Sequence, residues 1–288
     1  MKSIVESIAH RLSSPSRRRS KKFSLPRDEP IVALDNNPPD TSVIEGHGVN
    51  YQSPSEEDIP LLNLDLLSIK PADRQWFTDV NIAVRDLSKG SETQNNYGHI
   101  RRIVSNAAHI LDKEVKHHEW ARKLDPLIIW VSCMVYSVSR QLCRAAEKPC
   151  DQLDVIDDFL KSYGCPLSIR RQVAFIAVRV TVEIELYDVG PMKVFSDEYP
   201  AYRVIQDAHL LGEMGAIGIV RFYTFYGSFP PERWDLIRKI SKLVAVYLSQ
   251  YVQAMRTETG RKMAEERLKW MKEEFLRQWE READTSNV

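Results

Sequence analysis

Residues 203–226 read RVIQDAHLLGEMGAIGIVRFYTFY, and this stretch decides the fold that the rest of the chain must build around it. Gly212, Gly215 and Gly218 recur at intervals of three, so they strip one side of a helix of side chains and let another backbone pack closely. Each glycine costs about 1 kcal/mol of helix propensity relative to alanine, so we expect the stretch to be buried. Asp207 stands near its start, and a carboxylate beside buried surface needs hydrogen-bond donors, a cation or a metal. Asp207 is therefore where chemistry is expected.

The composition describes a chain that can bury one full core. Of its 288 residues 43% are hydrophobic, and 40 basic residues balance 40 acidic ones. This balance gives no specific signal for nucleic-acid binding. The longest apolar run, residues 127–138, is far shorter than the roughly 20 residues of a membrane span, so no transmembrane segment is predicted.

The first 58 residues differ in composition from the remainder. Residues 1–25 hold seven Lys or Arg against one acid, whereas residues 28–58 hold eight acids and no Lys or Arg. Opposite charge blocks among Pro and Ser are typical of a solvated, disordered segment. We predict a disordered basic-then-acidic leader over residues 1–58 and one domain over residues 59–288. Mitochondrial targeting is a less favoured interpretation of the basic block.

The cysteines and the N-terminus indicate a cellular compartment. The four cysteines lack the CxxC pairing of a zinc site, so reduced thiols are expected; they are Cys133, Cys143, Cys150 and Cys165. The N-terminus also lacks the apolar core of a secretory signal. We therefore expect an intracellular protein, with the cytoplasm favoured.

From residue 59 onward, apolar residues recur with the period of a helix. The pattern predicts helices over residues 71–87, 99–111, 120–140, 154–163, 169–185, 203–226, 234–255 and 261–282. Residues 169–185 are rich in β-branched side chains, so a strand is an alternative for part of them. The predicted fold class is all-α, in a single helical domain.

Three segments carry a family resemblance. Gln206-Asp207-Ala208 with residues 215–219 is similar to the motif DADRLDALGAIGIAR, and residues 97–103 are similar to DWxHxxRV. Residues 257–280 resemble the tail TxxGRxxAexRhxfmxxFLxxfxxE. These motifs belong to the small HD-domain proteins, a family of metal-dependent phosphohydrolases. The resemblance covers about residues 94–282 and implies an HD-domain-like helical bundle.

In that family four side chains hold a divalent metal ion: an early histidine, an adjacent His-Asp pair and a late aspartate. The resemblance places His99 and Asp207 at the first and last positions. The pair falls at Tyr136 and Ser137, and a neutral phenol and hydroxyl are poor ligands for a divalent cation. The sequence thus predicts a degenerate site that binds an ion of the Mn, Mg or Fe type weakly or not at all.

The resemblance also assigns roles around this site. Tyr136 joins His99 and Asp207 as the residues expected to carry any chemistry. Ser137, His209 and Arg102 are expected to line the pocket, although His209 stands where the family has its second acid.

Three functions remain open. The first is a pseudoenzyme that survives as a binding or regulatory module. The second is an active metal-dependent phosphohydrolase, in which His99 and Asp207, with His209, hold one ion that lowers the pKa of bound water. The third is metal-free small-molecule chemistry in the vacated pocket, with Tyr136 as proton donor or stacking surface. The expected partners are a nucleotide or phosphate-ester ligand and a protein partner or second copy of the chain.

Overall fold

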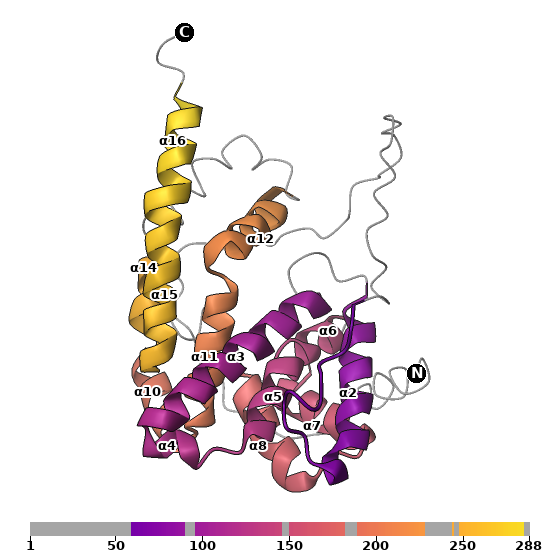
Figure 1. Cartoon of the computed structure of the whole chain (residues 1–288). Helices are drawn as coiled ribbons and strands as arrows, with labels where there is room; N and C mark the ends of the chain where they lie inside the picture. The colour runs from indigo at the N-terminus through magenta and orange to yellow at the C-terminus, as the bar shows by residue number, and fades with distance from the viewer. Residues whose placement is uncertain are drawn as a thin grey trace, which may run out of the picture.

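Helices form the regular elements of the residues that the structure describes, which are 59–89, 96–145, 150–181, 189–227, 244 and 248–284 of the computed structural model (Figure 1). No strand occurs within these ranges. The predicted all-α fold is confirmed, and the strand alternative is wrong for the described part of residues 169–185, where α8 spans Leu167–Ala177. Residues 1–58 lie outside the described ranges, so the disordered leader stays a prediction.

The helices of the described residues follow one another in a fixed order along the chain. After a 3-10 turn at Pro71–Asp73 they are α2 (Arg74–Leu87), α3 (Tyr97–His117), α4 (Glu119–Arg122), α5 (Pro126–Val135), α6 (Val138–Ala145), α7 (Gln152–Ser162), α8, α10 (Val189–Glu198), α11 (Ala201–Gly212), α12 (Gly215–Gly227), α14 (Leu248–Ala254), α15 (Glu258–Trp270), the π-helical η5 (Met271–Leu276) and α16 (Arg277–Ala283). Of the predicted helix at residues 234–255, only Val244 and the part from Leu248 lie within the described ranges.

Helix α11 is the centre of the fold. All of its residues except Arg203 are buried, and it packs against α3, α5 and α15. Helix α3 presents its apolar face to α11, and its first turn is closed by Asn96, whose side chain accepts a hydrogen bond from the His99 amide. Figure 1 shows α15 and α16 continuing as one long rod that begins beside α11 and ends at Ala283.

The stretch at residues 203–226 is two helices, so the expectation of one helix was wrong. Helix α11 ends at Gly212, and α12 begins at Gly215, whose φ of +80° favours glycine. A Cβ on Gly218 would stand 2.3 Å from the Glu213 carbonyl oxygen, so this glycine lets α12 close on the preceding turn. Gly215 and Gly218 therefore allow the bend between α11 and α12, and the three glycines do not line one face of a single helix.

The predicted helix at residues 120–140 is also divided. Helix α5 begins at Pro126, with the Asp125 side chain accepting from the Leu127 amide, and it ends at Val135. The chain turns at Tyr136 and Ser137 before α6 begins, so the two residues at the expected ligand-pair positions lie at a helix break.

Residues Pro126–Cys143 are apolar and long enough to cross a membrane by length and composition alone. Of this segment 72% is buried inside the protein, as expected for the central helices of a helical core. It is the single candidate span among the described residues.

The cysteines differ from the expectation that all four are reduced. Cys143 and Cys150 form a disulfide, with their Cα atoms 6.0 Å apart. Cys133 and Cys165 are buried free thiols. The pairing closes the connection between α6 and α7, which the sequence spacing alone did not predict.

Candidate functional site

The Asp207 carboxylate lies at the N-terminus of α15. Its Oδ1 accepts from the Arg256 amide at 2.9 Å, and its Oδ2 accepts from the Thr257 amide at 2.8 Å and the Thr257 hydroxyl at 2.6 Å. The side chain is fully buried. Both oxygens are therefore engaged by donors at the start of a helix, where unpaired amides and the helix dipole favour a negative charge.

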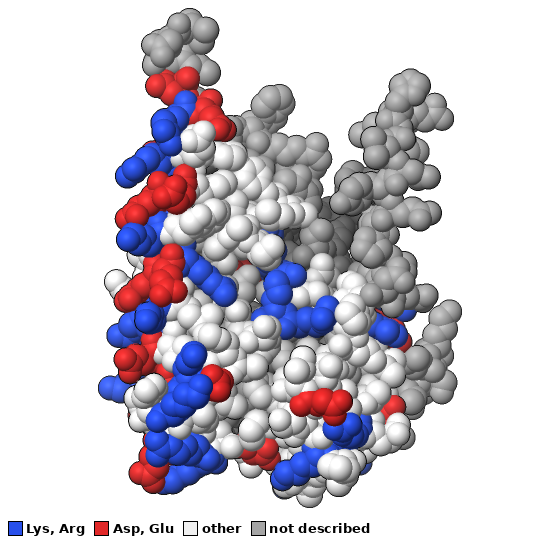
Figure 2. Space-filling view, in the orientation of Figure 1, with Lys and Arg blue, Asp and Glu red and all other residues white. Residues whose placement is uncertain are grey.

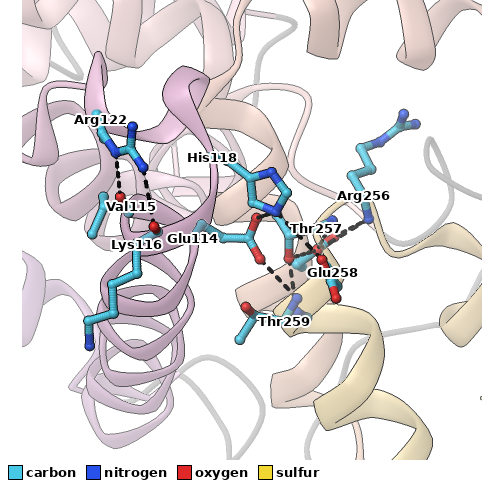
Figure 3. A network of polar contacts seen from close by, with 11 residues as sticks. Glu114, Val115, Lys116, His118, Arg122, Arg256, Thr257, Glu258 and Thr259 are labelled. Atoms are coloured by element: carbon cyan, nitrogen blue, oxygen red, sulfur yellow. Dashed lines mark hydrogen bonds and ion pairs between the residues drawn. The ribbon is translucent and has the colours of Figure 1, made fainter.

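A second buried carboxylate supports the same helix end. Glu114 on α3 accepts from the Thr259 amide at 2.9 Å, and its other oxygen lies 3.4 Å from Nε2 of His118. His118 also lies 3.6 Å from Glu258 (Figure 3). Figure 3 shows this network at the point where α3 meets the beginning of α15. Two acids from two helices thus anchor the N-terminus of α15.

Thr257 and Gly260 complete the anchor. The Thr257 hydroxyl, which donates to Asp207, also accepts from the Gly260 amide at 2.9 Å and so caps α15. A Cβ on Gly260 would stand 2.4 Å from Oδ2 of Asp207, so only glycine lets the carboxylate approach this closely. This geometry gives a physical reason for the Thr and Gly of the tail motif.

A different group of side chains lies at the C-terminal end of α11; we call His99, Tyr136, His209, Glu213 and Arg221 the polar cluster. The Tyr136 ring packs edge-on against His209, with their centroids 5.0 Å apart. Arg221 donates to Glu213 at 3.0 Å across the bend between α11 and α12. Nε2 of His99 lies 3.7 Å from the same Glu213 oxygen. The cluster therefore joins α3, α5, α11 and α12.

Burial and neighbouring arginines control protonation in the polar cluster. Burial, then the charges of Arg221, His209 and Arg102, lowers the pKa of His99 to about 2. Burial, then the charges of Arg140 and Arg221, lowers the pKa of His209 to about 3. Burial, with Glu213 adding to it, raises the pKa of Tyr136. Both imidazoles and the phenol are therefore neutral at pH 7, and the His99–Glu213 contact is not an ion pair.

Several nitrogens in and beside the polar cluster are buried without a hydrogen-bond partner. They are Nδ1 and Nε2 of His99, Nδ1 of His209 and Nε of Arg102. Buried polar atoms of this kind usually have partners, so their concentration at one place indicates a site rather than ordinary core.

The predicted site residues are brought together only in part. His99, Tyr136 and His209 meet in the polar cluster, and Arg102 lies close enough to influence His99. Ser137 is buried, and its hydroxyl accepts from the Gln141 side chain at 3.4 Å. Asp207 directs its carboxylate to residues 256 and 257. It stays a prediction that Ser137 and Asp207 share one pocket with the other residues.

This donor set does not fit a divalent metal site. The Asp207 oxygens already accept from backbone and hydroxyl donors. The charges of Arg221 and Arg102 act on His99, and Glu213, 3.7 Å from its Nε2, is paired with Arg221. No group of three or more His, Cys, Asp or Glu that could hold an ion occurs within the described ranges. Weak or absent binding of a metal ion in solution stays a prediction.

Sequence reasoning missed Glu114, Glu213 and Arg256. Glu114 had a visible signal, because it continues the apolar face of α3 one turn after Ile110. An acid on that face needs a partner. The other two had no comparable signal, since Glu213 sits at a helix end and Arg256 contributes a backbone amide.

A cavity of about 530 Å³ opens beside the polar cluster, where α3, the α11–α12 bend and α15 meet. Its walls are Arg102, Ser105, Asn106, Leu211, Gly212, Met214, Gly215, Ala216, Ile217, Glu266, Arg267 and Trp270. Arg102 is thus the predicted pocket residue that reaches this cavity.

No protein-family model matches the chain, and no curated protein matches it. Solved structures do match. Selenomethionine YpgQ of Bacillus subtilis is 20% identical, with a TM-score of 0.55 over 74% of this chain and 98% of YpgQ. The same protein in complex with ADP is 20% identical, with a TM-score of 0.52 over 71% of this chain and 98% of YpgQ. An HD-superfamily hydrolase of Bacillus thuringiensis is 17% identical, with a TM-score of 0.49 over 72% and 97%.

The chain is therefore similar in fold to nearly the whole length of YpgQ. The helical bundle that the sequence motifs imply therefore has the fold of YpgQ. At these identities the likeness concerns the fold alone.

Proposed function

We propose that this chain is a pseudoenzyme with the fold of an HD-superfamily hydrolase, acting as a binding or regulatory module whose metal centre has been lost. The observation that carries the proposal is the engagement of Asp207. The last metal ligand implied by the family resemblance holds the N-terminus of α15, through donors at 2.6–2.9 Å. A carboxylate so engaged would have to surrender these bonds before it could bind an ion.

The charges around His99 support the same proposal. Arg102 and Arg221 both act on His99, and Arg140 and Arg221 act on His209. A positive charge near an imidazole disfavours protonation of the ring. It also disfavours binding of a metal ion, because a proton and a metal ion both add positive charge at the ring nitrogen. Tyr136 and Ser137 supply no negative charge to offset this repulsion. Glu213 lies 3.7 Å from Nε2 of His99, but its carboxylate already pairs with Arg221, so the arginines outnumber the acid around the two imidazoles. We therefore expect the site to favour an anion over a metal ion.

An anionic ligand agrees with one of the similar structures. YpgQ was crystallised with ADP, and we propose a nucleotide or phosphate ester as the ligand class here. A protein partner, self-association and the intracellular compartment remain predictions from the sequence.

The two alternatives need different chemistry. An active metal-dependent phosphohydrolase needs His99 and Asp207 to share an ion, against the contacts just described. Metal-free chemistry with Tyr136 as proton donor needs a phenol that releases its proton, whereas burial raises the pKa of Tyr136. Neither alternative has an observation that favours it over the binding module.

Elemental analysis of the purified full chain, paired with phosphatase assays on a nucleotide panel with added Mn²⁺, tests the proposal. We expect substoichiometric metal and no turnover above the level of a His99→Ala variant. Stoichiometric metal, with turnover abolished by both His99→Ala and Asp207→Ala, would establish the phosphohydrolase instead.

A further inference from the structure

The cavity between α3, the α11–α12 bend and α15 lies beside the polar cluster and has no assigned role. Its volume of about 530 Å³ is that of a small-molecule site. In Figure 2 basic side chains gather near the middle of the face on which α3, α12 and α15 meet in Figure 1. Surface without Lys, Arg, Asp or Glu side chains lies on either side of them.

Two arginines in the cavity wall have no carboxylate partner among the ion pairs of the described residues. Arg267 donates to the Leu211 carbonyl and, at 3.1 Å, to Oδ1 of Asn106, both of which are neutral. Nε of Arg102 is buried with no hydrogen-bond partner. Burial, then the charge of Arg221, lowers the pKa of Arg102, and Glu213 partly opposes this. The cavity wall therefore holds two arginines that form no ion pair with Glu266, the acid in the same wall, or with another acid of the described residues.

The rest of the wall is mostly apolar. Trp270 on α15 and Ile217 on α12 both line the cavity, and they are 42% and 48% exposed. An exposed indole beside an aliphatic side chain offers a flat surface on which an aromatic ring can stack. Glu266, the acid in the wall, is exposed at the rim.

We infer that this cavity binds a phosphate ester attached to a flat ring, of the nucleoside monophosphate type. The phosphate contacts Arg102, and the ring packs against Trp270 and Ile217. A planar guanidinium suits a phosphate, because charge-assisted bonds between the two form in pairs. The inference rests on the proposed binding function, to which it gives a place and a ligand class.

The test is calorimetric titration of the full chain with AMP, adenosine and inorganic phosphate, all in EDTA. We expect AMP to bind more tightly than either fragment. Arg102→Gln should weaken AMP binding about tenfold or more, because it removes a charge-assisted pair. Trp270→Ala should weaken it about fivefold or more through lost stacking. Arg101→Gln, the neighbouring arginine outside the cavity wall, is the matched control and should change affinity less than about twofold.

A direct optical readout accompanies these titrations. AMP should change the tryptophan fluorescence of the wild type, and the change should be smaller in Trp270→Phe. Because Arg102 makes no ion pair within the described ranges, Arg102→Gln should unfold at the same urea concentration as the wild type. If it does not fold, Trp270→Ala carries the test.

Absence of AMP binding, equal affinity for a fragment alone, or equal losses in Arg101→Gln and Arg102→Gln would overturn the inference. If AMP binds only with Mn²⁺ and His99→Ala abolishes this binding, both this inference and the proposed function are wrong. If AMP does not bind and the protein holds no metal, only this inference is wrong.

Discussion

Helix α11 carries two buried polar regions that differ in how completely their groups are paired. Near its middle, both oxygens of Asp207 receive donors from the start of α15. At its end, His99 and His209 have buried nitrogens without partners and stand among arginines. A satisfied buried network stabilises a fold, whereas an unsatisfied one costs stability and is typical of a functional site. The first region therefore anchors the structure, and the second is where a ligand is expected.

The largest effect should follow removal of the anchor. Asp207→Ala leaves the Arg256 and Thr257 amides buried without an acceptor, and we expect a loss of about 3–5 kcal/mol in the free energy of unfolding. Urea unfolding measures it. Asp197→Ala, which removes an exposed acid paired with Arg203, is the control and should cost less than about 1 kcal/mol. Equal losses in the two variants would remove the distinction between the regions.

Acid should act mainly through the second region. The pKa values of His99 and His209 lie below the unfolded value of about 6.5, so the unfolded chain binds protons that the folded protein does not. Their contribution to stability is complete above about pH 6.5 and falls as the pH drops toward about 3. Between pH 7 and pH 5.5 we expect a loss of roughly 2–3 kcal/mol from these two groups.

Urea unfolding at the two pH values measures this loss. In a His99→Leu, His209→Phe double variant both titrating groups are gone, so its loss should be smaller by the same amount. An unchanged pH dependence in the double variant contradicts the assignment.

Close packing at the anchor should be sensitive to one methyl group. Gly260→Ala places a Cβ 2.4 Å from Asp207, so we expect a loss of about 2 kcal/mol through overpacking. Gly190→Ala is the matched control, because no atom lies within 4 Å of its new Cβ. Its stability should stay the same or rise. If both substitutions are tolerated equally, Asp207 does not sit against α15 as described.

The smallest effect should come from the capping hydroxyl. Thr257→Val keeps the shape of the side chain but removes its bonds to Asp207 and to the Gly260 amide, at a cost of about 1 kcal/mol. Thr259→Val is the comparison, because Thr259 is bound to Glu114 through its backbone amide. Thermal unfolding of the two variants side by side should rank Thr257→Val lower.

The sequence predicted the helices well because their apolar faces are periodic, as in α3 and α7. It did not predict where two of them divide. Tyr136–Ser137 and Glu213–Met214 lie inside segments whose apolar residues suggest one continuous helix, and only the packed structure shows that the chain turns there. A single glycine with positive φ, Gly215, makes one of these turns possible.

The sequence predicted several residues of the candidate site, but it did not predict which groups these residues contact. The motifs pointed to His99, Tyr136 and His209, which do meet. The donors to Asp207 are two backbone amides and the Thr257 hydroxyl, about 50 residues later. Backbone amides leave no mark on residue type, so sequence alone could not distinguish an anchoring carboxylate from a metal ligand.

Urea unfolding of the wild type and of Asp207→Asn, each in EDTA and in excess MnCl₂, tests the central claim most directly. The account predicts that Asp207→Asn loses the same stability in both solutions and that Mn²⁺ does not stabilise the wild type. An ion that binds only the folded protein raises its stability by mass action. Stabilisation of the wild type by Mn²⁺ that disappears in Asp207→Asn would show that Asp207 is a metal ligand and contradict the account.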